Sequence, residues 1–66
     1  MRLTINSETA EWPADTTLPA VFASLGLQGQ RVAVAVNGDV VPRALHDLFV
    51  LKADDRVDIL TMAGGG

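Results

Sequence analysis

The stretch RVAVAVNG, residues 31–38, decides the fold of this chain of 66 residues. Its three valines recur at every second position, which is typical of a β-strand with one buried face. The Asn-Gly pair that ends the stretch favours a tight hairpin, because both residue types tolerate a positive φ. We therefore expect a central strand over residues 31–37, followed by a further strand or extended segment at Val40 and Val41 that stops before Pro42.

Upstream of this strand, the sequence predicts an N-terminal hairpin. Polar and apolar residues alternate over residues 2–6, as in a half-buried strand. An Asn-Ser turn then allows residues 9–12 to return as a second strand. Pro13 ends this strand, because proline has no N–H to donate to the sheet.

One short amphipathic helix is expected between the hairpin and the central strand. Asp15, Thr16 and Thr17 are candidate N-caps, and Pro19 then falls in the first turn, where its missing N–H costs little. Gly26 is expected to follow the helix as a left-handed C′ residue. The predicted core face carries apolar residues spaced at i, i+3, i+4 and i+7, which are Leu18, Val21, Phe22 and Leu25.

The last third of the chain predicts a short element, a turn and a final strand. Residues 43–52 are too few for much more than a helical turn and a loop, so we expect a 3₁₀ or irregular element there. A turn at residues 53–55 leads into a strand over residues 56–62. Side chains alternate along this strand, so Val57 and Ile59 share one face, and the other face carries Asp58, Leu60 and Met62.

This order of elements predicts an α+β fold of the β-grasp, or ubiquitin-like, type. In such a fold one main helix covers one face of a mixed sheet of four to five strands, and the first and last strands pair in parallel at its centre. We expect the β-grasp domain to span residues 1–62 and to be followed by a flexible tail, residues 63–66. Fully extended, this tail reaches roughly 13 to 14 Å from the folded body.

The composition argues against several classes of function. The formal net charge is −3 and only five Lys and Arg are scattered along the chain, whereas nucleic-acid binding needs clustered positive charge. The sequence shows no signal peptide, and no apolar stretch approaches the roughly 20 residues of a membrane span, so we expect a cytoplasmic protein without nucleic-acid or membrane partners. The absence of cysteine excludes disulfides, thiolate chemistry and Cys-ligated zinc.

Three segments of the chain together resemble the ThiS-type sulfur carrier proteins of thiamine biosynthesis. They are VAVAVNGDVVPR at residues 32–43, DRVDIL at residues 55–60, and Gly-Gly at the C-terminus. The resemblance runs essentially from end to end, with one local departure at Asp54, where the family more often has glycine. Aspartate also tolerates turn conformations, so this departure concerns the geometry of the turn and not the family.

The resemblance implies a protein that carries sulfur and is not itself an enzyme. An E1-like adenylyltransferase would use ATP to convert the carboxyl group of Gly66 into an acyl-adenylate. A sulfurtransferase or cysteine desulfurase system would then replace AMP to give a thiocarboxylate, and a thiazole synthase would accept the sulfur. No cofactor is expected on the carrier itself. The bare backbone of Gly64 and Gly65 suits a narrow slot in a partner's active site.

Leu60 and Met62 are predicted to form an apolar patch that docks on partners. They stay exposed if the helix covers the opposite face of the final strand. Ala33 and Ala35, on the neighbouring strand, are expected to extend this patch. Arg43 is expected either at the rim of partner contacts or in solvent, and the same expectation applies to Arg56.

The remaining polar and aromatic side chains are expected to have structural roles. Asp54, Asp55 and Asp58 predict a solvated turn that at most steers the carrier toward a basic groove beside a partner's adenylation site. His46 is the only histidine, so we expect no metal site and a surface or partly packed position. The aromatic residues are expected in core or hairpin packing; they are Trp12, Phe22 and Phe49.

Alternative functions remain open on sequence grounds. The small subunit of molybdopterin synthase shares the β-grasp fold, the Gly-Gly end and the thiocarboxylate chemistry. A ubiquitin-like modifier would instead be joined to protein lysines through the same carboxyl group. A third possibility is a β-grasp interaction module whose tail is chemically inert.

Overall fold

The computed structural model describes residues 1–28 and 30–62. In chain order its elements are β1 (Arg2–Ile5), β2 (Glu8–Glu11), α1 (Leu18–Ser24), β3 (Val32–Val36), β4 (Asp39–Val40), the 3₁₀ helix η1 (Arg43–Leu48) and β5 (Arg56–Thr61). These elements confirm the hairpin, the single α-helix, the short 3₁₀ element and the final strand expected from the sequence. No helix in the described part of the chain combines the length and apolar character needed to cross a membrane.

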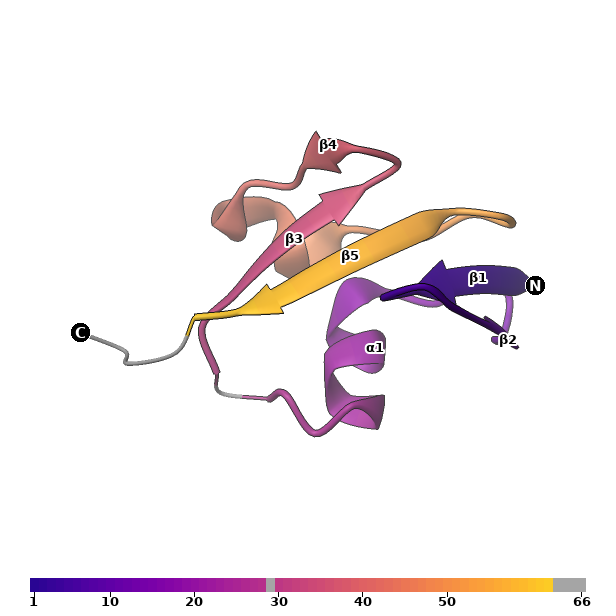
Figure 1. Ribbon diagram of the computed structural model, residues 1–66, viewed down its shortest axis with the longest axis horizontal. Helices are drawn as coiled ribbons and strands as arrows, with labels where there is room; N and C mark the ends of the chain where they lie inside the picture. The colour runs from indigo at the N-terminus through magenta and orange to yellow at the C-terminus, as the bar shows by residue number, and fades with distance from the viewer. Residues whose placement is uncertain (29, 63–66) are drawn as a thin grey trace.

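The described strands form one mixed sheet in the order β2-β1-β5-β3-β4. β1 and β5, the first and last strands, pair in parallel, and the other neighbours pair antiparallel. Figure 1 shows α1 on one side of this sheet, with β5 running through its middle. The expected β-grasp fold is therefore confirmed, and the parallel pair lies at the interior of the sheet as expected.

Helix α1 is bounded by the two caps that the sequence predicted. The Thr17 hydroxyl oxygen accepts a hydrogen bond from the N–H of Ala20 at 3.3 Å. At the other end Gly26 has a φ of +71°, its N–H bonds the carbonyl of Ala23, and the N–H of Leu27 bonds the carbonyl of Phe22. This pair of bonds is a Schellman motif, which satisfies carbonyls that the helix leaves free.

The core lies between α1 and the inner face of the sheet. Its fully buried side chains include Leu18 and Val21 from α1 and Val57 from β5. The expectation that Leu25 belongs to this core is wrong, because its side chain is 45% exposed. Helix α1 ends at Ser24, and Leu25 is the capping residue with φ −92° and ψ 1°, so the helical period no longer applies there.

The turn between β3 and β4 is fastened to the start of β5. Asn37 and Gly38 both have positive φ, 52° and 86°, as a type I′ hairpin requires. The Asn37 side-chain amide donates to Asp55 Oδ1 at 2.9 Å, and its oxygen accepts the N–H of Arg56 at 2.9 Å. Asp54 adopts a φ of 68°, so aspartate does take the turn conformation for which the family more often uses glycine.

Candidate functional site

The described chain ends directly after β5, at a position still tied to β3. Thr61 pairs with Val32, and the N–H of Met62 donates to the carbonyl of Arg31 at 3.0 Å. Figure 1 shows this end of β5 beside the start of β3. The predicted reactive residues, Gly64, Gly65 and Gly66, lie outside the described residues, so their roles remain predictions. The structure does define the surface from which the chain continues toward them.

The outward face of β5 carries exposed apolar side chains next to this end. Leu60 is 68% exposed and Met62 is 54% exposed, whereas Val57 is 0% and Ile59 is 9% exposed. The alternation expected from the sequence is therefore present, with the face toward α1 buried and the opposite face open. Whether Leu60 and Met62 dock on a partner remains a prediction.

Two small residues on β3 lie beside this row. Ala33 is paired with Leu60 and Ala35 with Asp58, and both alanines are half-buried. Val40 of β4 is the register partner of Ala35 and is 77% exposed. Because the alanine methyl groups are short, a shallow apolar hollow is left between Leu60 and Val40. We call the surface formed by Ala33, Ala35, Val40, Leu60 and Met62 the outer apolar patch.

Val40 is a member of the outer apolar patch that sequence reasoning missed. The signal was available, because an Asn-Gly hairpin places the residue two positions after the glycine beside Ala35. Sequence reasoning treated Val40 only as part of a strand and did not extend the pairing to a shared face. The hairpin register carries the side chain onto the same face as Leu60.

The three aspartates near β5 do not form a common solvated turn. Asp55 is half-buried, where it accepts from the amide of Asn37 and, at 2.8 Å, from the N–H of Lys52. Asp58 lies on the outward face of β5, and its Oδ2 is 3.6 Å from Nε of Arg56. Asp54 is exposed in the left-handed turn. Asp55 therefore builds the turn, which corrects the expectation of three solvated carboxylates.

His46 is a buried structural residue. It is 8% exposed, less than the surface or partly packed position expected. Its Nε2 donates to the carbonyl of Val41 at 3.0 Å, and its ring meets Phe22 edge-on with centroids 5.8 Å apart. Because the chain turns back on itself between β4 and η1, the imidazole is enclosed between that turn and α1. Nothing among the described residues groups three or more His, Asp or Glu side chains around a potential metal position.

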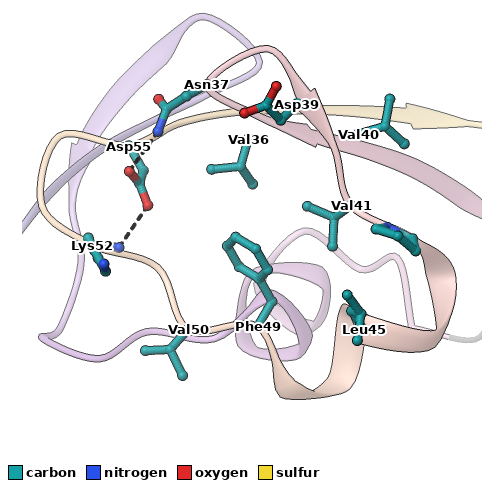
Figure 2. Close-up of a pocket in the computed structure, with 11 residues that line it drawn as sticks. Val36, Asn37, Asp39, Val40, Val41, Leu45, Phe49, Val50, Lys52 and Asp55 are labelled. Atoms are coloured by element: carbon teal, nitrogen blue, oxygen red, sulfur yellow. Dashed lines mark hydrogen bonds between the residues drawn. The ribbon is translucent and has the colours of Figure 1, made fainter.

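A second hollow lies near the opposite end of β3, against β4 and η1. Figure 2 shows Phe49 reaching between Val36 and Val41 at its base, with the Asp55 to Lys52 hydrogen bond at its edge. Phe49 packs against the core, as do Trp12 and Phe22, which confirms the packing role expected for the aromatic residues. This hollow was not anticipated from the sequence, and it is separate from the end of β5.

Comparison with known proteins gives a family match over the whole chain. The model of the ThiS family matches residues 1–66. The chain is 32% identical over 66 residues to a thiazole synthase of Paramagnetospirillum magneticum and 35% identical over 66 residues to a thiazole synthase of Magnetococcus marinus. It spans 20% of the length of each of these curated relatives, so each contains a segment similar to this chain.

Two solved structures from Geobacter metallireducens share the fold. The crystal structure of a thiamine biosynthesis protein (ThiS) superimposes with a TM-score of 0.81 and 29% identity, over 100% of both chains. The solution structure of a thiamine biosynthesis protein gives a TM-score of 0.76 and 30% identity, over 100% of this chain and 88% of the other.

Proposed function

The chain belongs to the ThiS family, and from this membership we propose that it is a sulfur carrier of thiamine biosynthesis. The family match over all 66 residues is the observation that carries the proposal. The shared β-grasp fold supports it, since a ThiS structure superimposes over 100% of both chains. The carrier acts as a protein cosubstrate, and its partners are the enzymes.

The proposed chemistry takes place at the carboxyl group of Gly66. A carboxylate is a poor acyl donor until one of its oxygens becomes part of a leaving group. In the proposed first step, a carboxylate oxygen attacks the α-phosphorus of ATP on an E1-like adenylyltransferase, and pyrophosphate leaves. In the second step, the terminal sulfur of a persulfide on a sulfurtransferase or cysteine desulfurase attacks the acyl carbon, and AMP leaves. A thiol then cuts the S–S bond of the resulting acyl disulfide and forms a disulfide with the donor sulfur. The product is a thiocarboxylate that donates its sulfur to the thiazole ring.

The residues before Gly66 have a proposed mechanical role. Gly64 and Gly65 have no Cβ, so the backbone can enter a slot that would exclude any side chain. We assign these two residues to the partner's active-site channel. The chain contains no cysteine, so sulfur cannot travel on it as a persulfide. A terminal carboxyl group is the acceptor that this chemistry needs.

Thiazole synthase is the proposed acceptor of the sulfur. Two proteins of that name contain a segment similar to this whole chain, within a polypeptide of which it makes up 20%. Joining two modules on one polypeptide raises the concentration of each near the other, which is useful when they must meet repeatedly. We infer that this chain meets a thiazole synthase and passes its sulfur to that enzyme.

The outer apolar patch is the proposed docking surface for these enzymes. It lies on the open face of the sheet and reaches the end of β5, so a partner that covers it receives the following residues directly. Exposed apolar side chains surrounded by polar ones are typical of the centre of a protein interface. Leu60 and Met62 provide the largest apolar side chains of this surface.

Intact-mass spectrometry tests the proposed chemistry. The protein is incubated with ATP, its adenylyltransferase and a sulfur donor. Exchange of one carboxyl oxygen for sulfur adds about 16 Da to the carrier. Omitting ATP should abolish the gain, and so should deletion of Gly66, which leaves the described fold untouched.

Other outcomes of the same experiment contradict the proposal. A gain of kilodaltons would show conjugation to another protein and favour a ubiquitin-like modifier. No change with a competent activating enzyme would leave an inert interaction module. Sulfur transfer to a molybdopterin precursor, and none to thiazole synthase, would favour the molybdopterin synthase subunit.

A further inference from the structure

The arginines of this chain are divided between the two ends of the sheet. Arg31 lies directly before β3, and its carbonyl is bonded to the N–H of Met62, so it stands at the end of β5. Arg43 begins η1 and lines the same groove as Arg31 and Met62. Arg56 begins β5, at the far end of that strand, and faces Asp58. Two exposed cations therefore flank the position where the described chain ends.

Most acidic side chains lie away from the tail end of the sheet, as Arg2, Lys52 and Arg56 also do. Asp39, Asp54 and Asp55 lie in or beside the turns at the far end of β3 and β5, where Asn37 is bonded to Asp55. Asp47 of η1 is the acidic residue that shares a hollow with Arg43, and Arg43 forms no ion pair with another described residue. The chain has a net charge of −3, yet the groove at the tail end of the sheet is lined by two arginines and by no Asp or Glu among the described residues.

The groove between these two arginines has an apolar floor. Ala33 and Val32 of β3 line it, and Met62 lies at its edge. The base of the groove is held by His46, whose Nε2 bonds the carbonyl of Val41. Val41 precedes Arg43 by two residues, so this bond holds the chain just before η1 begins. A small apolar floor with charged residues at the rim is the ordinary anatomy of a protein interface.

We propose that Arg43 and Arg31 recognise carboxylate side chains at the mouth of the slot in the activating enzyme that receives the tail. The inference rests on the proposed function and specifies the chemistry of the partner. It replaces the expectation of a basic partner surface beside the adenylation site, because the acidic residues of the carrier lie mainly at the other end. Opposite charges at the two ends orient the carrier so that its tail approaches first.

Protein carboxylates fit this position better than the phosphates of the nucleotide. Four residues separate Met62 from the carboxyl group of Gly66, a span of roughly 13 to 14 Å when the backbone is extended. In the proposed complex the nucleotide lies at the inner end of the channel, where the carboxyl group of Gly66 arrives. An arginine side chain at the channel entrance is too short to reach it. The rim of the channel entrance is the surface that Arg43 and Arg31 meet.

The test compares reversal of one charge at each end of the sheet. Arg43→Glu and the control Arg56→Glu change the net charge equally, and both arginines are exposed. ATP–pyrophosphate exchange by the adenylyltransferase is measured against carrier concentration, at low and at high ionic strength. We expect Arg43→Glu to raise the KM for the carrier about tenfold at low salt with kcat unchanged, because rim charges act mainly on association. Arg56→Glu should stay within about twofold, and high salt should shrink the difference.

Each other outcome overturns the inference. Equal KM values for the two variants, each with an unchanged unfolding midpoint, would show that position on the sheet does not matter. A changed KM for ATP instead of the carrier would place Arg43 at the nucleotide. Arg31→Glu should act in the same direction as Arg43→Glu, and an effect confined to one of the two would refute their joint role. Absence of exchange with the wild-type chain would overturn the proposed function as well, whereas exchange with equal KM values overturns the arginine inference alone.

Discussion

At the scale of single residues, a few polar side chains fasten strands that lie far apart in the sequence. Asn6 Oδ1 accepts the N–H of Ile59 at 2.7 Å, across 53 positions, just after β1 ends. Asn37 fastens the β3–β4 turn to Asp55 and to the N–H of Arg56. Each such bond adds about 1 kcal/mol, which matters in a small domain because its net stability is itself only several kcal/mol.

Asn37 should make two separable contributions to stability. Its φ of 52° suits asparagine and glycine, and its side chain makes the two bonds to β5 and the preceding turn. Asn37→Gly keeps the backbone conformation and loses the bonds, so we expect a loss of about 1 kcal/mol in the free energy of unfolding. Asn37→Ala also places alanine in the left-handed region, where it has neither the freedom of glycine nor the local hydrogen bonding of asparagine, and this adds about 1 kcal/mol more. Urea unfolding measures the free energy of unfolding of both variants. Equal losses for Asn37→Gly and Asn37→Ala would contradict a separate contribution from the backbone conformation.

At the scale of elements, periodicity predicted the helix, the strands and their buried faces. An apolar spacing of two residues fits a strand, and a spacing of three and four fits a helix, so each pattern indicates one type of element. It failed at Leu25, since the apolar spacing continues past the residue where the helix ends. Periodicity also said nothing about Arg43, which is brought beside Arg31 by the return of the chain from β4. That neighbourhood depends on sheet register and turn length together. The exposed face of β5 was thus predictable, because one alternation decides exposure there. Arg43 was named from the sequence as a candidate rim contact, but its position beside Arg31 was not predictable.

The C-terminal cap of α1 depends on backbone conformation alone. Gly26 has a φ of +71°, and a Cβ added there would meet nothing within 4 Å. Gly26→Ala should therefore cost about 1 kcal/mol through backbone strain, without any clash. Gly26→Asn should cost less, because asparagine enters the left-handed region more readily. Thermal or urea unfolding of both variants tests this, and a larger cost for asparagine than for alanine would argue against strain as the cause.

At the scale of the whole molecule, the two faces of the sheet have different roles, one in folding and one in contact with partners. Its inner face and α1 form the core, and its outer face is left open for contact. Asp58 and Leu60 occupy alternate positions on that open face of β5, so the strand already tolerates an aspartate beside Leu60. The outer apolar patch can therefore be altered without disturbing the core. This separation makes docking and folding distinguishable by experiment.

Leu60→Asp should weaken binding to the partner enzymes while leaving the fold intact. The substitution places a charge in the middle of the outer apolar patch, where a partner would have to desolvate it, so we expect the Kd for the adenylyltransferase to rise at least about tenfold. Leu48→Asp is the matched control, because Leu48 is a 78% exposed leucine on η1 and not a member of that patch. Calorimetric titration gives both Kd values, and circular dichroism confirms the fold. Equal affinity of the two folded variants would exclude the outer apolar patch as the docking surface, because exposure and residue type are alike and only position on the molecule differs.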